Sequence, residues 1–266
     1  MGGSRLESVL FGQEGSVATV TLNRPEVYNA LNFELGSQLT TALERCQADA
    51  SVRVVVITGA GRGFCGGGDL KAASAYSPED PSRFFRELTK HFHRLVTDIR
   101  LLPKPVLAAV NGPAGGAGVS LALACDLRIA SEAARFKQAY TSNALVPDGG
   151  WTAFAPLIVG LGRASEMVFL DPVIDAQRAL EIGLVNQVVP AENFAAAVKE
   201  VATRLAAGPT LAFARAKALL NASLLPALEA QLERERQAIS ASARTRDFTE
   251  GLAAFLAKRP PDYAGK

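Results

Sequence analysis

The sequence predicts a mixed α/β fold with a layered, spiral core, and three observations support this prediction. An apolar strand, a glycine-rich loop and a short helix follow one another twice, over residues 52–71 and again over 105–124. Both strands are too apolar for an exposed edge, which is typical of a sheet whose two faces are covered. From about residue 191 the pattern changes to helices rich in Ala, Leu, Glu and Arg. We therefore expect a spiral α/β core over 1–190 and a helical C-terminal region over 191–266.

The chain is expected to open with a hairpin followed by a helix. Glu7–Phe11 and Val17–Leu22 have the composition of strands and are separated by a turn at 12–15. Asn32 has the short polar side chain that caps helices, and a helix is expected from Phe33 to Gln47. Further core elements are expected, in order, at Val52–Thr58, Ser82–Arg100, Pro105–Val110, Val119–Ala124 and Asp126–Ala130. C-terminal helices are expected at Ala191–Ala207, Thr210–Leu220, Leu224–Ala243 and Arg244–Ala257.

Composition limits the possible partners and compartments. The chain has 266 residues, of which 48% are hydrophobic and 20% charged, the balance of an ordinary globular protein. The 28 basic and 26 acidic residues give a net charge of +2, which favours neither nucleic acid nor an anionic membrane as a partner. Cys46, Cys65 and Cys125 lack metal-ligand spacing and are expected to be reduced thiols. Residues 1–6 lack the apolar stretch of a signal peptide, and no apolar run is long enough to span a bilayer, so a cytoplasmic protein is expected.

The two glycine-rich loops, 59–70 and 111–118, are the strongest functional signal. A glycine loop that leads into a helix leaves the first helical amides unpaired, at the positive end of the helix dipole. Two such loops on neighbouring strands can direct two N–H groups at one oxygen, which is the arrangement of an oxyanion hole. Two alternatives remain at this point: the glycines serve only tight turns, or Gly61-x-Gly63-x-x-Gly66 binds a dinucleotide, although this loop is not in the first strand–helix unit.

Motifs spread from about residue 5 to the end of the chain resemble those of the crotonase (enoyl-CoA hydratase/isomerase) superfamily. The motifs, in the order and spacing of that family, are Asn23-Arg24-Pro25 with Asn29-Ala30-Leu31, Gly63-Phe64-Cys65-x-Gly67-x-Asp69-Leu70, Pro105-Val106-x-Ala108-x-Val110-Asn111-Gly112-x-Ala114-x-Gly116-x-Gly118, Leu121-Ala122-x-x-Cys125-Asp126 and Gly183-Leu184-Val185-Asn186-x-Val188-Val189. The joint match is specific for the fold and for CoA-thioester chemistry, and much less specific for the reaction.

The resemblance implies a spiral of ββα units and an acyl-CoA thioester as substrate, with no separate cofactor because coenzyme A is part of the substrate. It implies trimers that often pair into hexamers, and a C-terminal region that forms the trimer and covers CoA. It places the thioester oxygen between the backbone amides of Gly68 and Ala117. The positions that match substrate contacts of the family are Arg24, Ala30, Lys71, Ser120, Tyr140, Phe255 and Lys258. The last two match tail residues that usually reach a neighbour's CoA, although solvated basic residues and packed helical phenylalanines are also common without any ligand.

The family's hydratases use two glutamates, and Ser120 and Tyr140 stand at the matching positions here. Adding water across a double bond needs one group to activate water and another to deliver a proton. Neither a serine nor a tyrosine hydroxyl has an ordinary pKa suited to this work at neutral pH. The sequence therefore argues against ordinary two-glutamate hydration.

Asp148 is the carboxylate expected to do the chemistry. It aligns with the acid of some isomerases and of the ring-modifying phenylacetyl-CoA branch, and in a dehalogenating relative the same position is a nucleophile. Isomerisation needs a single base that removes a proton from one carbon and returns it to another. Apolar neighbours such as Val146 and Trp151 would make a carboxylate here a stronger base. The alternative is a structural role, because Pro-Asp-Gly-Gly is a common turn sequence.

The two histidines, His91 and His93, are two residues apart in one predicted helix and cannot share a face. His93 aligns roughly with a catalytic position of the dehalogenase-like relatives, and with Ser120 it would allow thioester hydrolysis, although such a histidine is more often structural. We therefore expect an isomerase that uses Asp148 as acid and base. The alternatives are an atypical hydratase, a hydrolase or dehalogenase with Asp148 as nucleophile, and a non-catalytic acyl-CoA-binding or scaffold protein.

Overall fold

The computed structural model describes residues 7–77 and 79–266, so the sequence-based prediction for residues 1–6 lies outside the described residues. The main sheet has six strands in the order β1-β2-β3-β4-β6-β9. Its strands are β1 (Val9–Glu14), β2 (Val17–Leu22), β3 (Val54–Gly59), β4 (Val106–Val110), β6 (Leu127–Ser131) and β9 (Gln187–Val189). The β1–β2 pair is antiparallel and forms the predicted hairpin, and every following pair is parallel. The α/β prediction is confirmed.

The chain also forms a second, smaller sheet of three strands in the order β5-β7-β8. Its strands are β5 (Ala114–Gly115), β7 (Arg135–Lys137) and β8 (Ile174–Asp175). Because β5 lies inside the second glycine loop, this loop is part of a sheet and not a simple turn. The sequence did not predict these strands, since two or three residues carry no readable alternation.

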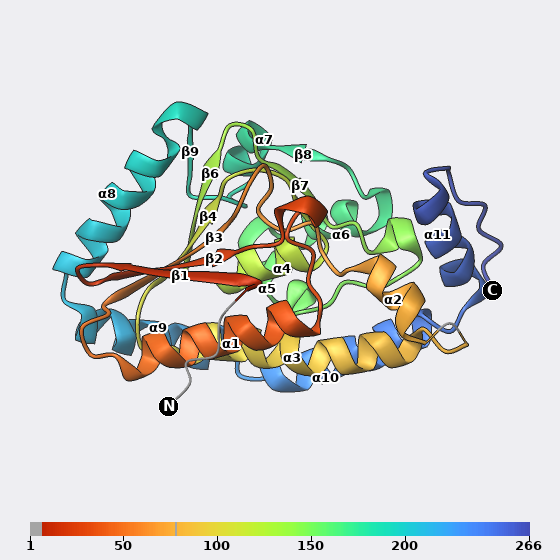
Figure 1. Cartoon of the computed structure of the whole chain (residues 1–266), viewed down its shortest axis with the longest axis horizontal. Coiled ribbons are helices and arrows are strands. Elements are labelled where there is room, and N and C mark those ends of the chain that lie inside the picture. The colour runs from red at the N-terminus through yellow and green to blue at the C-terminus, as the bar shows by residue number, and fades with distance from the viewer. Residues whose placement is uncertain (1–6, 78) are drawn as a thin grey trace.

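One face of the main sheet is covered by long helices. They are α1 (Phe33–Ala48), α3 (Ser82–Leu101) and α10 (Leu228–Ser242), which lie together below the sheet in Figure 1. Asn32 caps α1 as predicted, its side chain accepting a hydrogen bond from the Leu35 amide at 2.9 Å. The buried faces of α1 and α3 pack together with buried residues of β1, β2, β3 and β4 in the larger of two hydrophobic cores.

The opposite face of the sheet is covered by α8 (Phe194–Ala207), which packs on β2, β3 and β6. Buried residues from this contact, among them Val54, Leu107 and Ala202, form the second core. The expectation that the apolar strands are covered on both faces is therefore confirmed. Since α8 follows residue 190 and completes this core, the helical C-terminal region packs directly on the spiral part of the chain.

The remaining helices are mostly short. They are α2 (Leu70–Tyr76), α4 (Ala117–Ala124), α5 (Trp151–Val159), α6 (Leu161–Leu170), α7 (Ala176–Glu181), α9 (Thr210–Leu224) and α11 (Arg246–Ala257), with 3-10 turns η1 (Pro25–Val27), η2 (Thr141–Asn143) and η3 (Ala191–Asn193). Two of these helices, α4 and α7, contact the second sheet, whereas α9 packs on α3 and α8. At one end of the molecule, α11 lies beside α2 (Figure 1). Among the described helices none alone is long and apolar enough to cross a membrane, and only the bent pair α9 and α10 reaches that length and composition together.

Candidate active site

The two glycine loops pack directly against each other. The Gly115 amide donates a hydrogen bond to the Cys65 carbonyl oxygen at 2.9 Å. Gly67 has a φ of +105°, and a Cβ built on it would lie 2.9 Å from the carbonyl oxygen of Gly115. A Cβ on Gly115 would lie 3.1 Å from the carbonyl oxygen of Gly66. These glycines are therefore needed because two backbones meet at a separation that excludes side chains.

Gly68 and Ala117 follow this contact on their respective loops, and both line the same cavity. Ala117 is the first residue of α4 and follows Gly116, whose φ is +48°. Within residues 7–77 and 79–266, neither the Gly68 nor the Ala117 amide donates a hydrogen bond to another backbone group. Two unpaired N–H groups on one small cavity are the arrangement that a developing oxyanion requires.

The cavity has a volume of about 130 Å³ and a mostly apolar wall. Its lining comes from the two glycine loops, α3, the segment before α5, α10 and α11. The residues are Leu31, Gly66, Gly67, Gly68, Leu70, Phe85, Leu88, Thr89, Phe92, Gly116, Ala117, Ala139, Tyr140, Asn143, Leu145, Asp148, Ile239 and Phe255. Among these lining residues Asp148 is the one carboxylate.

Asp148 is held at the start of a tight turn. Gly149 and Gly150 have φ values of +69° and +79°, and α5 begins one residue later. A Cβ on Gly149 would lie 2.1 Å from the ring of Phe92 on α3. The residues Pro-Asp-Gly-Gly therefore form a turn, as one interpretation of the sequence expected. The same turn places the Asp148 side chain, which is only 4% exposed, on the lining of the cavity.

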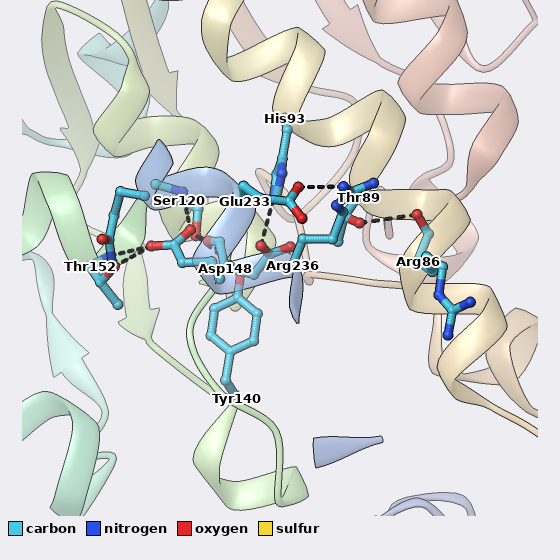
Figure 2. A network of polar contacts seen from close by, with 12 residues as sticks. Arg86, Thr89, His93, Ser120, Tyr140, Asp148, Thr152, Glu233 and Arg236 are labelled. Atoms are coloured by element: carbon cyan, nitrogen blue, oxygen red, sulfur yellow. Dashed lines mark hydrogen bonds and ion pairs between the residues drawn. The ribbon is translucent and has the colours of Figure 1, made fainter. Parts of the chain in front are cut away.

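The carboxylate of Asp148 is paired with His93. The two atoms His93 Nε2 and Asp148 Oδ1 lie 2.6 Å apart, and the His93 side chain is 12% exposed. In Figure 2 His93 extends from α3 toward Asp148. His91 points elsewhere, and its ring lies 6.3 Å from that of Phe33. The helix therefore separates the two histidines as expected, and His93 is the one that meets the candidate base.

Ser120 and Tyr140 hold the backbone of Asp148. The Ser120 hydroxyl donates to the Asp148 carbonyl oxygen at 2.6 Å, and the Tyr140 hydroxyl donates to the same oxygen at 3.1 Å (Figure 2). Burial, reinforced by the charge of Asp148, raises the pKa of Tyr140 well above its usual value, so the phenol stays protonated. Tyr140 lines the cavity as expected. Ser120 is not on this lining: it is fully buried and its hydroxyl binds the Asp148 carbonyl oxygen, so its expected contact with substrate stays a prediction.

A third ionisable group lies beside this pair and was not found from the sequence. Glu235, on α10, is 3% exposed, and its carboxylate accepts hydrogen bonds from the amides of Gly150 and Thr152. Burial, followed by the charge of Asp148, raises the pKa of Glu235 to about 7, against the lowering effect of these hydrogen bonds. Helix α10 carries several other charged residues, so nothing in the local sequence distinguishes Glu235 from a solvent-exposed glutamate.

His93, Asp148 and Glu235 lie close enough together to be examined as a metal site. One potential ligand atom from each lies within 4.8 Å of the others. However, both oxygens of Glu235 already accept hydrogen bonds from α5, and Asp148 Oδ1 is bound to His93. These atoms satisfy one another, and the set fits a hydrogen-bonded group better than a metal centre.

Three residues expected to contact CoA lie before or after the first glycine loop in the chain. Arg24 pairs with Asp69 at 3.0 Å and donates to the Ala30 carbonyl oxygen at 2.5 Å, so its guanidinium ties the segment before α1 to the end of the first glycine loop. Lys71 is exposed on the first turn of α2. Neither Arg24, Ala30 nor Lys71 belongs to the lining of the cavity itself.

Phe255 lines the cavity of its own chain, because α11 packs on η2 and α2. Lys258 is exposed at the end of the same helix, with a φ of +54°. The resemblance had assigned both residues to a neighbour's CoA. The described contact of Phe255 is within one chain, and the reach of Lys258 to a neighbour stays a prediction.

The last residues of the chain fasten α11 in this position. The Tyr263 hydroxyl donates to the Ser142 carbonyl oxygen of η2 at 2.8 Å. Asp247, in the first turn of α11, accepts hydrogen bonds from the amides of Ala264 and Gly265, each at 2.8 Å. The tail therefore folds back along α11 and connects it to the loop that carries Tyr140.

Comparison with known proteins agrees with this arrangement. Residues 12–266 match the family described as enoyl-CoA hydratase/isomerase. The chain belongs to this family. The 1,2-epoxyphenylacetyl-CoA isomerase of Escherichia coli strain K12 is 38% identical over 262 residues, 98% of this chain and 100% of that protein. A Rhodobacter capsulatus protein named "Probable enoyl-CoA hydratase" is 42% identical over 250 residues, 94% of this chain and 95% of the relative.

Solved structures give the same answer for the fold. The crystal structure of an enoyl-CoA hydratase from Mycobacterium avium subsp. paratuberculosis K-10 matches with a TM-score of 0.88 and 39% identity, covering 97% of this chain and 98% of that one. The crotonase fold is therefore confirmed, and the chain is an acyl-CoA enzyme of the crotonase superfamily. Isomerases and hydratases both occur among the relatives, so the family alone does not choose the reaction.

Proposed function

We propose that this enzyme isomerises an enoyl-CoA or a ring-derived acyl-CoA, with Asp148 as the acid and base. The observation that carries the proposal is that Asp148 is the one carboxylate on the lining of the cavity that Gly68 and Ala117 also line. A family member with two catalytic carboxylates would place a second one on this lining. Here the corresponding positions carry Ser120 and Tyr140, whose hydroxyls bind the Asp148 carbonyl oxygen instead.

The proposed chemistry moves one proton. The amides of Gly68 and Ala117 bind the thioester oxygen, and Asp148 removes a proton from a carbon made acidic by that thioester. The electron pair of the broken C–H bond moves into the enolate, whose oxygen carries the charge between the two amides. The carboxyl proton on Asp148 exchanges with solvent, and Asp148 then delivers one proton to a different carbon, so that atoms and charge balance and the double bond has shifted. His93, on α3, holds the Asp148 carboxylate through its Nε2 atom.

The proposed proton transfer uses only the Asp148 carboxylate and the amides of Gly68 and Ala117, and we propose that it requires no cofactor. Arg24, Ala30 and Lys71 are proposed to bind CoA at the first glycine loop, and Phe255 and Lys258 to bind it from the C-terminal helix. The enzyme is further proposed to act as a cytoplasmic homotrimer or hexamer. Gel filtration with light scattering tests the assembly, since a monomer would contradict it.

A second candidate function is favoured by the same His93–Asp148 contact. With Asp148 as a nucleophile, the carboxylate would attack the thioester carbonyl carbon and displace the CoA thiolate, or attack a halogen-bearing aryl carbon and displace halide. His93 would then activate the water that releases the product. This reaction leaves a mixed anhydride or an aryl ester on Asp148 for part of the cycle. A reversible proton transfer never forms such an adduct, so the two functions differ in a directly measurable intermediate.

The test is a panel of 2-enoyl-, 3-enoyl- and aryl-CoA thioesters, with product identification for the wild type and Asp148→Asn. Isomerisation predicts solvent deuterium in the product and a loss of turnover of at least ~100-fold in Asp148→Asn, with acyl-CoA binding retained. An adduct on Asp148 detected by mass spectrometry would support the nucleophile instead. Binding without turnover of any thioester would support an acyl-CoA-binding or scaffold role, and hydrated products would support an atypical hydratase.

A further inference from the structure

Glu235 joins α10 to the segment that follows Asp148. Its Oε2 accepts a hydrogen bond from the Gly150 amide at 2.6 Å, and its Oε1 accepts one from the Thr152 amide at 2.9 Å. The Thr152 hydroxyl also donates to Oε1, and Gln231 on the same helix donates to that hydroxyl at 2.8 Å. The first amides of a helix have no partner within the helix. Glu235 therefore caps α5 from a distant part of the chain.

This cap acts on a turn that glycine leaves easy to deform. Gly149 and Gly150 both have positive φ, a conformation that glycine adopts freely and also leaves freely. Gly150, which precedes α5, has no side chain with which to cap the helix itself. On the other side of the turn, the Asp148 carbonyl oxygen is fixed by two hydroxyl groups. Glu235 is thus the side chain that fixes the downstream half of the turn.

We propose that Glu235 is a positioning residue that keeps the Asp148 carboxylate directed into the cavity by clamping the Gly149–Gly150 turn. This inference rests on the proposed function of Asp148. Glu235 is not on the cavity lining, so it acts on the reaction through Asp148 and not on the substrate. Potential ligand atoms of Glu235, Asp148 and His93 lie within 4.8 Å of one another, so a displaced turn changes the whole polar group.

The matched pair of variants is Glu235→Gln and Glu229→Gln. Glu229 is on the same helix, is exposed, and serves as the control. Gln keeps the size of the side chain but replaces one acceptor oxygen by an NH2 donor. This donor then faces a backbone N–H group, which is also a donor, so one hydrogen bond to the turn is lost. A displacement of about 1 Å at a reacting group costs on the order of 100-fold. We expect kcat of Glu235→Gln to fall at least ~10-fold with KM changed less than about twofold, and Glu229→Gln to match the wild type.

Hydrogen exchange measured by mass spectrometry supplies a readout that is independent of turnover. The peptide covering residues 146–154 should exchange faster in Glu235→Gln than in the wild type, while peptides from β3 and β4 should be unchanged. Thr152→Val removes one donor to Glu235 and keeps the shape of the side chain. It should lower kcat in the same direction, by about threefold, and it remains informative if Glu235→Gln does not fold.

Four outcomes decide the proposal. A kcat within about twofold of the wild type in both Glu235→Gln and Thr152→Val, with Asp148→Asn inactive, overturns the positioning role and leaves the proposed function standing. A raised KM with unchanged kcat also overturns it, because that result places Glu235 in substrate binding. Full activity in Asp148→Asn overturns the proposed function and this inference with it. The split between kcat and KM described above, together with faster local exchange, supports it.

Discussion

His93 and Asp148 form the central contact of the site: Nε2 of the histidine lies 2.6 Å from Oδ1 of the carboxylate, and both side chains are nearly buried. They come from α3 and from the turn before α5, which are 55 residues apart. The contact restricts the carboxylate to one orientation at the cavity. A base must be correctly placed before its proton affinity matters, so this contact is the first to test.

Removing the imidazole should impair turnover more than binding. For His93→Ala we expect kcat to fall at least ~10-fold with KM nearly unchanged, because the carboxylate loses its lateral partner. His93→Gln can still donate a hydrogen bond and should retain more activity than His93→Ala. Steady-state kinetics on the best thioester of the panel measures both. His91→Ala is the control, since His91 is exposed and on a different face of α3; equal losses in both histidine variants would contradict the assignment.

The turn after Asp148 should tolerate no side chain. In Gly149→Ala the new Cβ would lie 2.1 Å from the Phe92 ring, in a backbone conformation that L-residues rarely adopt. We expect a loss of roughly 2–4 kcal/mol in the free energy of unfolding, measured by urea denaturation. Gly162→Ala in α6 meets nothing within 4 Å and should be neutral or stabilising by up to ~1 kcal/mol. If both variants lose stability alike, crowding at Gly149 is not the cause.

Stability should depend on pH through Glu235. Its pKa is raised from 4.5 to about 7 in the folded protein, so the folded state binds the proton more tightly than the unfolded chain does. This contribution is fully present below pH 4.5 and is lost as the pH rises toward 7. The total is about 3 kcal/mol.

Urea unfolding at pH 5, 6, 7 and 8 measures this dependence, with the wild type compared with Glu235→Gln. The difference in unfolding free energy between the two proteins should change in the variant's favour as the pH rises, because Gln does not titrate. A difference that stays constant over this range would show that the ionisation of Glu235 is not linked to folding.

The contact between Tyr263 and Ser142 should influence substrate binding. Tyr263→Phe removes the hydroxyl bond that ties the tail to η2, and α11 with Phe255 then loses one of its attachments beside the cavity. We expect KM for the acyl-CoA to rise about threefold, with kcat nearly unchanged, since a single hydrogen bond contributes about 1 kcal/mol. Tyr76→Phe is the control on neighbouring α2. A fall in kcat with constant KM would instead mean that the tail acts on the chemistry.

The sequence was informative wherever the signal was local. The β1–β2 hairpin, the Asn32 cap and the apolar strands followed from periodicity and from short-range side-chain chemistry. The two glycine loops were recognised because close backbone packing demands glycine at fixed positions, and the structure shows Gly67 and Gly115 in that contact. Asp148 stood out because it aligns with the acid of some isomerases of the family that the sequence resembles, in a chain that lacks the two hydratase glutamates.

The site was less predictable where long-range packing decides it. Glu235 lies in a segment of alternating Glu and Arg that resembles a solvated helix, and only the contact of α10 with α5 buries it. His93 was one of two histidines, and the packing of α3 determines which of them faces Asp148. Ser120 was placed against the substrate by its position in the chain, whereas its hydroxyl is directed to a backbone oxygen. No local sequence pattern encodes where the side chains of Glu235, His93 and Ser120 point.

The hydrogen bonds from Glu235 to Gly150 and Thr152 span 85 and 83 residues. A chain emerging from the ribosome therefore completes its glycine loops and its Asp148 turn long before the helix that fastens that turn is available. The nascent chain contains the Asp148 turn without its cap until α10 has been synthesised and has docked. The turn is thus made before the helix that fastens it, and a fragment that stops before residue 228 would keep both glycine loops while lacking the Glu235 cap.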